Sequence, residues 1–288
     1  MVRMSPRADA GWRDLRWTLR NAENVILSGL HVYPIKSCAG ISLQRSDLSA
    51  TGLRHDRRWM LVDETGEFMS QRAHPRMAMI SVRFAAERMI VSAPGMGELE
   101  VPLYPQAPDS IDVRVWGDTN RGTLVSEEAD RWFGEYLEFS CRLVHKPDDD
   151  PRLVDSSMAE RGDQVSFADG FAFLLISEAS LEDLNSRLKD PLPMNRFRPN
   201  LVVRGCVPYA EDGWSRLRIG GVPFRVAEPC PRCAITTVDQ RTGARGNEPL
   251  RTLATYRKSE LGTVFGRNLI HNTLGTLHVG DPIETTPR

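Results

Sequence analysis

The sequence predicts a mostly β protein with some helices, of the α+β class. Short runs of apolar and β-branched residues, separated by turn residues, recur from about Val25 to the end of the chain. Only a few segments show the 3.6-residue periodicity of an amphipathic helix. The chain has 288 residues, of which 41% are hydrophobic and 26% charged. This composition is typical of a globular protein with one large domain or two ordinary ones.

The first half of the chain contains a series of predicted strands. These are Ile26–Tyr33, Trp59–Val62, Glu67–Ser70, Met79–Phe84 and Met89–Ser92. Pro34 and a glycine-containing turn follow the first of them, and Glu64-Thr65-Gly66 gives a hairpin turn between the second and third. Strands at this spacing indicate a β-barrel or sandwich-like unit.

One helix is predicted next, over Ser126–Leu137. Ser126 is a suitable cap, acidic residues follow in the first turn, and Ala129, Phe133 and Leu137 share one face with Trp132.

A long polar segment, Lys146–Asp163, then separates the two halves. It has few apolar anchors and is predicted to be a flexible loop. We therefore predict a leader over residues 1–23, an N-terminal β-barrel-like domain over 24–145 and a second domain over 146–288.

The second half is again mostly β. The predicted strands are Phe171–Ile176, Leu201–Val203, Leu217–Ile219, Pro223–Val226 and Thr276–Val279. Gly220-Gly221 makes a hairpin of the third and fourth. A helix is predicted over Ser177–Leu188, with Ser180 and Asp183 resembling a capping box.

Charge and cysteine content exclude some protein classes. The net charge of −1 argues against a general nucleic-acid binder. The sequence has neither the apolar run of a membrane helix nor a signal peptide, and Asp9 and Asp14 fit a transit peptide poorly. Five cysteines spread over this length do not form a secreted disulfide framework, so a reducing cytoplasm is expected.

The most specific local motif is Cys230-Pro-Arg-Cys233. The chain has no second CxxC and no histidine pair at ligand spacing, so a zinc site is disfavoured. The motif follows a predicted hairpin, which disfavours a thioredoxin-like redox pair. Two alternatives remain: a single thiolate ligand or nucleophile with Arg232 beside it, or two structural cysteines.

Three weaker motifs carry polar residues suited to anions. Lys36 and Ser37 lie in a glycine-containing turn that could bind phosphate. Arg57 lies at the start of a predicted strand. Arg198 and Asn200 precede another strand, and alternation puts their side chains on the same side of the chain. The alternatives are an ordinary turn for the first motif, a solvated strand edge for the second and a purely structural segment for the third.

Together these segments resemble the molybdenum-cofactor sulfurase C-terminal (MOSC) domain family. YPIKSCAG and DRRWMLV resemble its N-terminal β-barrel domain. FLLISEASLEDLNSRL, FRPNLVVRGC, PCPRCAITTVDQRTG and EPLRTLATYR resemble the MOSC domain itself, also a β-barrel. The resemblance covers about residues 24–286 and is greatest to the branch of the mitochondrial amidoxime-reducing component and its bacterial relatives.

The resemblance implies a role for particular residues. Cys233 corresponds to the molybdenum ligand and is the expected catalytic centre. The residues that correspond to contacts with the molybdopterin (Mo–pyranopterin) cofactor are Lys36, Ser37, Arg57, Arg198 and Asn200. Cys206 is assigned to the same cofactor site, with its role open. Family members differ before the FLLIS strand, where this chain has Gly170-Phe171, and this position bears on substrate contact.

The implied function is a molybdenum oxidoreductase that removes oxygen from small N-hydroxylated substrates by oxo transfer. The expected partners are a separate ferredoxin-, flavodoxin- or cytochrome-type electron donor and its reductase, with no nucleic acid and no membrane anchor. The alternatives are a molybdenum-cofactor carrier or sulfur-transfer protein, and a binding module in which the CxxC is structural.

Overall fold

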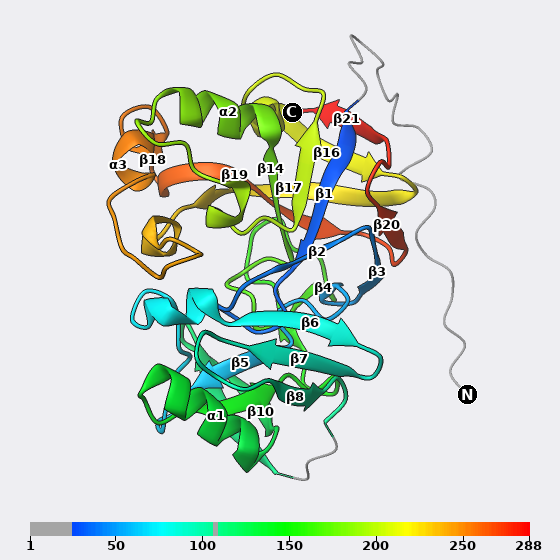
Figure 1. Ribbon diagram of the computed structural model, residues 1–288. Helices are drawn as coiled ribbons and strands as arrows, with labels where there is room; N and C mark the ends of the chain where they lie inside the picture. Colours follow the sequence, from blue (N-terminus) through cyan, green and yellow to red (C-terminus); the bar gives the residue numbers. More distant parts are fainter. Residues whose placement is uncertain (1–24, 106–108) are drawn as a thin grey trace, which may run out of the picture.

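The computed structural model describes residues 25–105 and 109–288 and shows two stacked bodies. In Figure 1 the upper body contains α2, α3 and the long strands of the second half, and the lower body contains α1 and the strands around β5 to β10. The predicted leader, residues 1–23, lies outside the described residues. The prediction of a mostly β protein with some helices is confirmed.

The upper body is built on one large mixed sheet. Its order is β2-β1-β15-β14-β19-β17-β16-β21, and β18 pairs with β19. The strands are β1 (Ile26–Val32), β2 (Ile41–Leu43), β14 (Phe173–Ser177), β15 (Leu201–Arg204), β16 (Trp214–Ile219), β17 (Val222–Pro231), β18 (Lys258–Ser259), β19 (Gly262–His271) and β21 (Ile283–Pro287). Apolar side chains from these strands form one continuous core.

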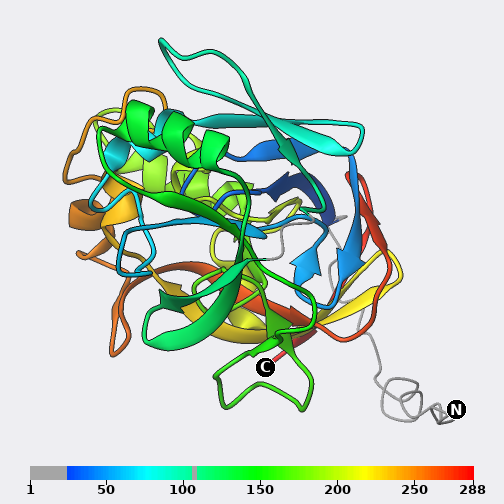
Figure 2. The same cartoon turned by 90° about the horizontal axis from the view of Figure 1, so that it is seen from below.

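The lower body holds two smaller sheets. One has the order β5-β11-β10-β9 and the other β6-β7-β8. The strands are β5 (Trp59–Val62), β6 (Ser81–Ala85), β7 (Arg88–Ser92), β8 (Leu99–Pro102), β9 (Ser110–Val115), β10 (Asp118–Leu124) and β11 (Arg142–His145). The view from below in Figure 2 brings α1 and these strands to the front.

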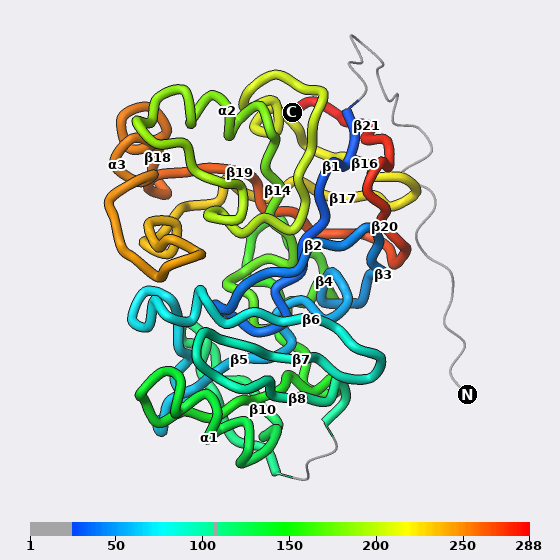
Figure 3. Tube along the Cα trace, in the orientation of Figure 1, coloured from blue at the N-terminus to red at the C-terminus, as the bar shows by residue number. Residues whose placement is uncertain are grey.

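Strand pairs join segments that lie far apart in the sequence. Strand β1 pairs with β15, and β3 (Arg45–Ser49) pairs with both β4 (Gly52–Leu53) and β20 (Thr276–His278). Figure 3 follows the chain from β1 in the upper body down into the lower body. The division into residues 24–145 and 146–288 therefore stays a prediction, because the large sheet takes strands from both ranges.

Three α-helices lie within the described residues, and two have side-chain caps. They are α1 (Glu127–Leu137), α2 (Glu178–Ser186) and α3 (Leu250–Leu253). The Ser126 hydroxyl accepts from Ala129 N, as predicted. The cap of α2 is Ser177, which accepts from Ser180 N, so the predicted capping role of Ser180 is wrong. The extended backbone of Ser177 explains this, because a cap residue lies outside the helix and Ser180 lies within it. None of the described helices is long and apolar enough to span a membrane.

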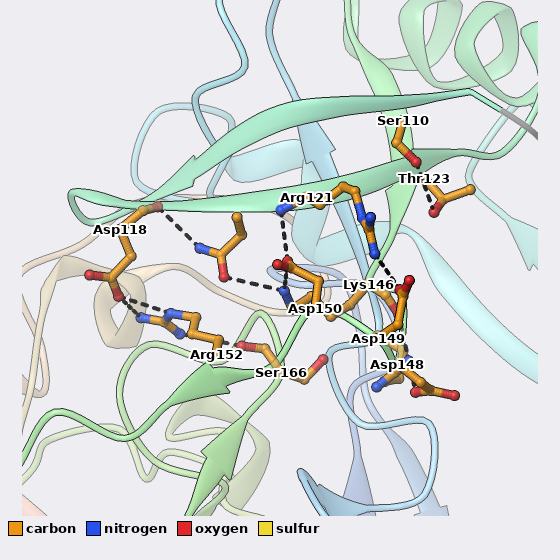
Figure 4. Close-up of polar contacts among 12 residues, drawn as sticks. Ser110, Asp118, Arg121, Thr123, Lys146, Asp148, Asp149, Asp150, Arg152 and Ser166 are labelled. Atoms are coloured by element: carbon orange, nitrogen blue, oxygen red, sulfur yellow. Dashed lines mark hydrogen bonds and ion pairs between the residues drawn. The ribbon is translucent and has the colours of Figure 1, made fainter.

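The polar segment 146–163 is anchored to the lower body. Its short strand β12 (Arg152–Leu153) pairs with β13 (Gln164–Val165). Figure 4 shows two ion pairs that join it to β10, Arg121–Asp149 and Arg152–Asp118, and one within the segment, Lys146–Asp150. The flexibility of this segment stays a prediction. Besides these ion pairs, Val154 packs in a small apolar cluster with residues of β17 and β19, Ala227 and Ile270, so the segment contacts the large sheet as well.

Candidate functional site

A cavity of about 470 Å³ collects most of the predicted site residues. Both halves of the sequence contribute to its wall. Lys36, Ser37, Arg57, Arg198, Asn200 and Cys233 all line it. Cys206 is not among the lining residues and packs instead against the core of the large sheet, so the structure does not bring it together with the others.

The turn that follows β1 presents Lys36 and Ser37 to the cavity. Ser37 has a positive φ of 67°, and its carbonyl oxygen accepts from Gln71 Nε2 at 2.7 Å. A Cβ at Gly40 would lie 2.4 Å from Tyr33 Cε1, so the turn can close against this ring only with glycine. Burial lowers the pKa of Lys36, while the ion pair with Asp169 opposes this shift.

Two arginines share the ring of Tyr33. The guanidinium carbons of Arg57 and Arg198 lie 4.3 and 4.2 Å from its centroid. Arg57 Nη1 donates to Asp56 Oδ2 at 2.6 Å and to Asn200 Oδ1 at 2.9 Å. Burial lowers the pKa of Arg198 to about 10 and raises that of Tyr33 to about 12. Cation–π contacts therefore hold two cations side by side at the cavity wall.

The cavity wall carries an excess of positive charge. Its cations are Lys36, Arg57, Arg72, Arg198 and Arg232, whereas its carboxylates are Asp169 and Glu228. Arginine forks and a lysine gathered on one cavity wall favour an anionic ligand, because partial burial lowers the local dielectric and strengthens charge-assisted hydrogen bonds.

The two cysteines of the CxxC motif have different cationic neighbours. Cys230 is the penultimate residue of β17, and Cys233 lies just before the short 3₁₀ helix Ala234–Thr237. Arg72 Nη1 lies 3.5 Å from the sulfur of Cys233, whereas Arg232 Nη1 lies 3.0 Å from that of Cys230. The expectation that Arg232 would be the cation at Cys233 is wrong, since its guanidinium turns toward Cys230 and the Phe197 carbonyl oxygen.

Three residues of this site are not predicted from the sequence. Arg72 is 161 positions from Cys233, Trp116 lies in the β9–β10 turn, and Asp169 follows β13. The Trp116 indole donates to Asp169 Oδ1 at 3.0 Å. Desolvation acts to raise the pKa of Asp169, but the Lys36 ammonium and this indole outweigh it and hold the pKa below its ordinary value. No local pattern marks these residues.

Two family models match the chain. The MOSC N-terminal beta barrel domain matches residues 24–140, and the MOSC domain matches residues 162–284.

The chain is also similar to curated proteins. Mitochondrial amidoxime-reducing component 1 of Mus musculus is 38% identical, over 88% of this chain and 80% of the relative. The protein of the same name from Xenopus laevis is 34% identical, over 96% of this chain and 87% of the relative. That from Homo sapiens is 35% identical, over 88% of this chain and 81% of the relative. These relatives are named as mitochondrial, which overturns the prediction of a cytoplasmic location. With both domain models matched and relatives above 30% identity over most of its length, the chain belongs to the MOSC-domain family, together with the amidoxime-reducing components.

Proposed function

We propose that this protein is a molybdenum–molybdopterin oxidoreductase that reduces small N-hydroxylated substrates. One observation carries the proposal: a single cavity combines a thiol, Cys233, with the buried cations Lys36 and Arg198 and the largely buried Arg57. The relatives named as amidoxime-reducing components support the class of substrate.

The cavity residues fit the phosphate of a pyranopterin. The side chains of Lys36 and Arg198 are at least nine-tenths buried, and Ser37 lies beside Lys36 in a turn with positive φ. Buried cations are unfavourable unless a counter-charge meets them. A dianionic phosphate would supply that charge to Arg198 and add to the carboxylates of Asp169 and Asp56, which already pair with Lys36 and Arg57. Asn200 would fix the Arg57 guanidinium through the 2.9 Å contact.

The thiols fit a metal that arrives with its own organic ligands. The described residues contain no group of three or more His, Cys, Asp or Glu side chains suited to holding a metal ion. A metal already bound by a dithiolene needs only one more protein ligand, and a soft thiolate suits it. Cys233 is the thiol whose neighbour, Arg72, comes from the lower body.

When bound, the cofactor would supply the two-electron removal of oxygen, which is the step that side chains alone do not perform. In this reduction the N–O bond breaks, two electrons and two protons are consumed, and the oxygen leaves as water. Arg72 and the ionised Asp169 would place opposite charges near the substrate, and the aromatic wall would limit the access of water. The electrons would come from a separate ferredoxin-, flavodoxin- or cytochrome-type protein and its reductase.

The first test measures molybdenum per chain and pterin fluorescence after oxidation. Wild type, Cys233→Ala and Cys230→Ala are expressed in a host that makes the cofactor. We expect near-stoichiometric metal in the wild type and in Cys230→Ala. Amidoxime reduction should fall by more than about a hundredfold in Cys233→Ala, since even outer-shell partners of a metal contribute 10- to 100-fold.

Two outcomes would contradict the proposal. Wild-type reduction by Cys233→Ala would remove the cysteine from the mechanism. Absence of molybdenum and pterin from every variant would favour the alternative of a cofactor carrier or sulfur-transfer protein, for which the two cavity thiols, Cys230 and Cys233, provide candidate groups.

A further inference from the structure

Trp116 occupies an unusual position at the edge of the cavity. It forms, with Gly117, the two-residue turn between β9 and β10, where Val115 pairs with Asp118. Both turn residues have positive φ, 61° and 130°. Such turns favour Asn-Gly, and a bulky side chain in the left-handed region is unfavourable. Strained residues of this kind concentrate where a ligand is held.

The indole of Trp116 is exposed and fixed at the same time. Its exposed fraction is 55%, yet it lines the cavity rather than pointing to bulk solvent alone. Its nitrogen donates to Asp169, and the Arg72 guanidinium carbon lies 4.4 Å from its ring centroid. The ring of Phe68 lies 5.2 Å away in a tilted arrangement. An exposed aromatic face held by such contacts offers a preorganised surface for stacking.

A second anchor holds the turn in place. Asp118, two residues after Trp116, accepts from Arg152 Nε at 2.9 Å, as Figure 4 shows. Arg152 also donates to the carbonyl oxygens of Ala168 and Asp169, at 2.7 and 3.1 Å. The turn is therefore linked to Asp169 in two ways. Trp116 contacts the Asp169 side chain, and Arg152 connects Asp118 to the Asp169 backbone.

The position of Trp116 relates it directly to Cys233. Arg72 is in contact with the indole ring and with the sulfur of Cys233, so one guanidinium separates the two. Apolar side chains also line the cavity: Phe68, Phe171, Phe173, Leu174, Phe197 and Ile235. A flat apolar group could pack on the indole while its polar end extends toward the sulfur.

We propose that Trp116 is a specificity-determining residue, whose indole stacks on the flat apolar part of aromatic N-hydroxylated substrates and selects them over aliphatic ones. The reductase chemistry itself rests on the function proposed above. The stacking surface is a property of the cavity and can be measured without turnover.

The experiment compares wild type, Trp116→Ala and Trp116→Phe with Phe139→Ala. Phe139 is a matched control because its side chain is 43% exposed, is aromatic and does not line the cavity. Benzamidoxime and hexanamidoxime share the reacting group and differ in the flat ring. Each is assayed on cofactor-loaded protein with reduced methyl viologen as the electron source. Binding of benzamidine, which has no N–O bond, is measured by calorimetry on the same preparations.

We expect the ratio of kcat/KM for benzamidoxime to that for hexanamidoxime to fall about tenfold in Trp116→Ala, with benzamidine binding weakened by a similar factor. Trp116→Phe should keep most of the ratio, and Phe139→Ala should equal the wild type. An unchanged ratio with unchanged benzamidine binding in Trp116→Ala would overturn the inference. So would a loss that is equal for both amidoximes and accompanies reduced molybdenum content, because Trp116 would then act on the cofactor.

Failure of the proposed function gives a different result. If loaded wild-type protein reduces neither amidoxime, the reductase assignment is wrong. The dependence of benzamidine binding on Trp116 then decides the stacking proposal alone.

Discussion

Two buried lysines, Lys36 and Lys146, both lie near Phe167 and have different surroundings. The exposed fractions of Lys36 and Lys146 are 5% and 2%, and each pairs with an aspartate, Asp169 or Asp150. Lys36 Nζ donates to the Phe167 carbonyl oxygen at 2.8 Å, and Lys146 Nζ lies 5.9 Å from the Phe167 ring centroid. Burial lowers the pKa of both side chains.

The neighbours of the two ammonium groups differ. Lys146 Nζ donates to Asn120 Oδ1 at 3.3 Å and to Asp150, which also accepts from the backbone of Arg121, as Figure 4 shows. This network ties the connecting segment to the lower body. Lys36 lines the cavity beside other cations. Burial and pairing are therefore common to both lysines, and the proposed cofactor role of Lys36 rests instead on the excess of positive charge around it.

Of the changes that test this comparison, Lys36→Met should have the largest effect. Loss of one charge-assisted contact to the phosphate should weaken cofactor retention by about 10- to 100-fold. Stability should fall by about 1 kcal/mol, because the Phe167 carbonyl oxygen loses its donor, whereas the Asp169 side chain left behind is 57% exposed and can be solvated. Molybdenum and pterin per chain after gel filtration, with chemical unfolding of the same samples, test both parts. Full cofactor content in this variant would contradict the phosphate site.

Lys146→Met should lower the stability of the fold and leave cofactor content unchanged. The free energy of unfolding should fall by about 2 kcal/mol, because Asp150 and the buried Asn120 oxygen each lose a partner. Cofactor content should equal the wild type. Denaturant titration beside Lys36→Met measures the contrast, and a loss of cofactor without a loss of stability would show that the two lysines do not differ as proposed.

A smaller effect concerns the pH dependence of folding stability, to which two histidines of the lower body should contribute. Burial, aided by nearby arginines, lowers the pKa of His55 to about 4 and that of His145 to about 3. Between these values and the ordinary 6.5, the unfolded chain binds more protons than the folded one. The stability that the two neutral histidines contribute is therefore fully present above about pH 6.5. It is lost as the pH falls toward their folded-state pKa values of about 4 and about 3.

The two histidines together should contribute about 1–2 kcal/mol, after allowance for their partial exposure. Carboxylates also titrate in this range, so the measurement compares unfolding of the wild type with His55→Asn/His145→Asn at pH 7 and pH 4.5. The double variant should lose less stability on acidification. Equal losses would show that the histidines do not control this pH dependence.

Local features of the fold were predictable from the sequence. The strands Ile26–Val32, Trp59–Val62 and Arg88–Ser92, the hairpin at Gly220-Gly221 and the helix capped by Ser126 match the predictions within a few residues. Each depends on neighbours in the chain. Strands β19 and β21 were missed because the first mixes glycine, arginine and asparagine with its apolar residues and the second ends in polar residues and proline. Packing in the large sheet decides their conformation.

The sequence by itself determined the separate pieces of the site: a lysine–serine turn that needs Gly40, two arginines in short polar motifs, and two cysteines that follow a hairpin. The tertiary structure decided which cation lies beside which sulfur and placed Trp116 at the cavity wall. It also left Cys206 partly buried against the core of the large sheet. The physical reason is distance along the chain. A contact between Arg72 and Cys233 spans 161 residues and depends on how the strands between them pair, which no local pattern encodes.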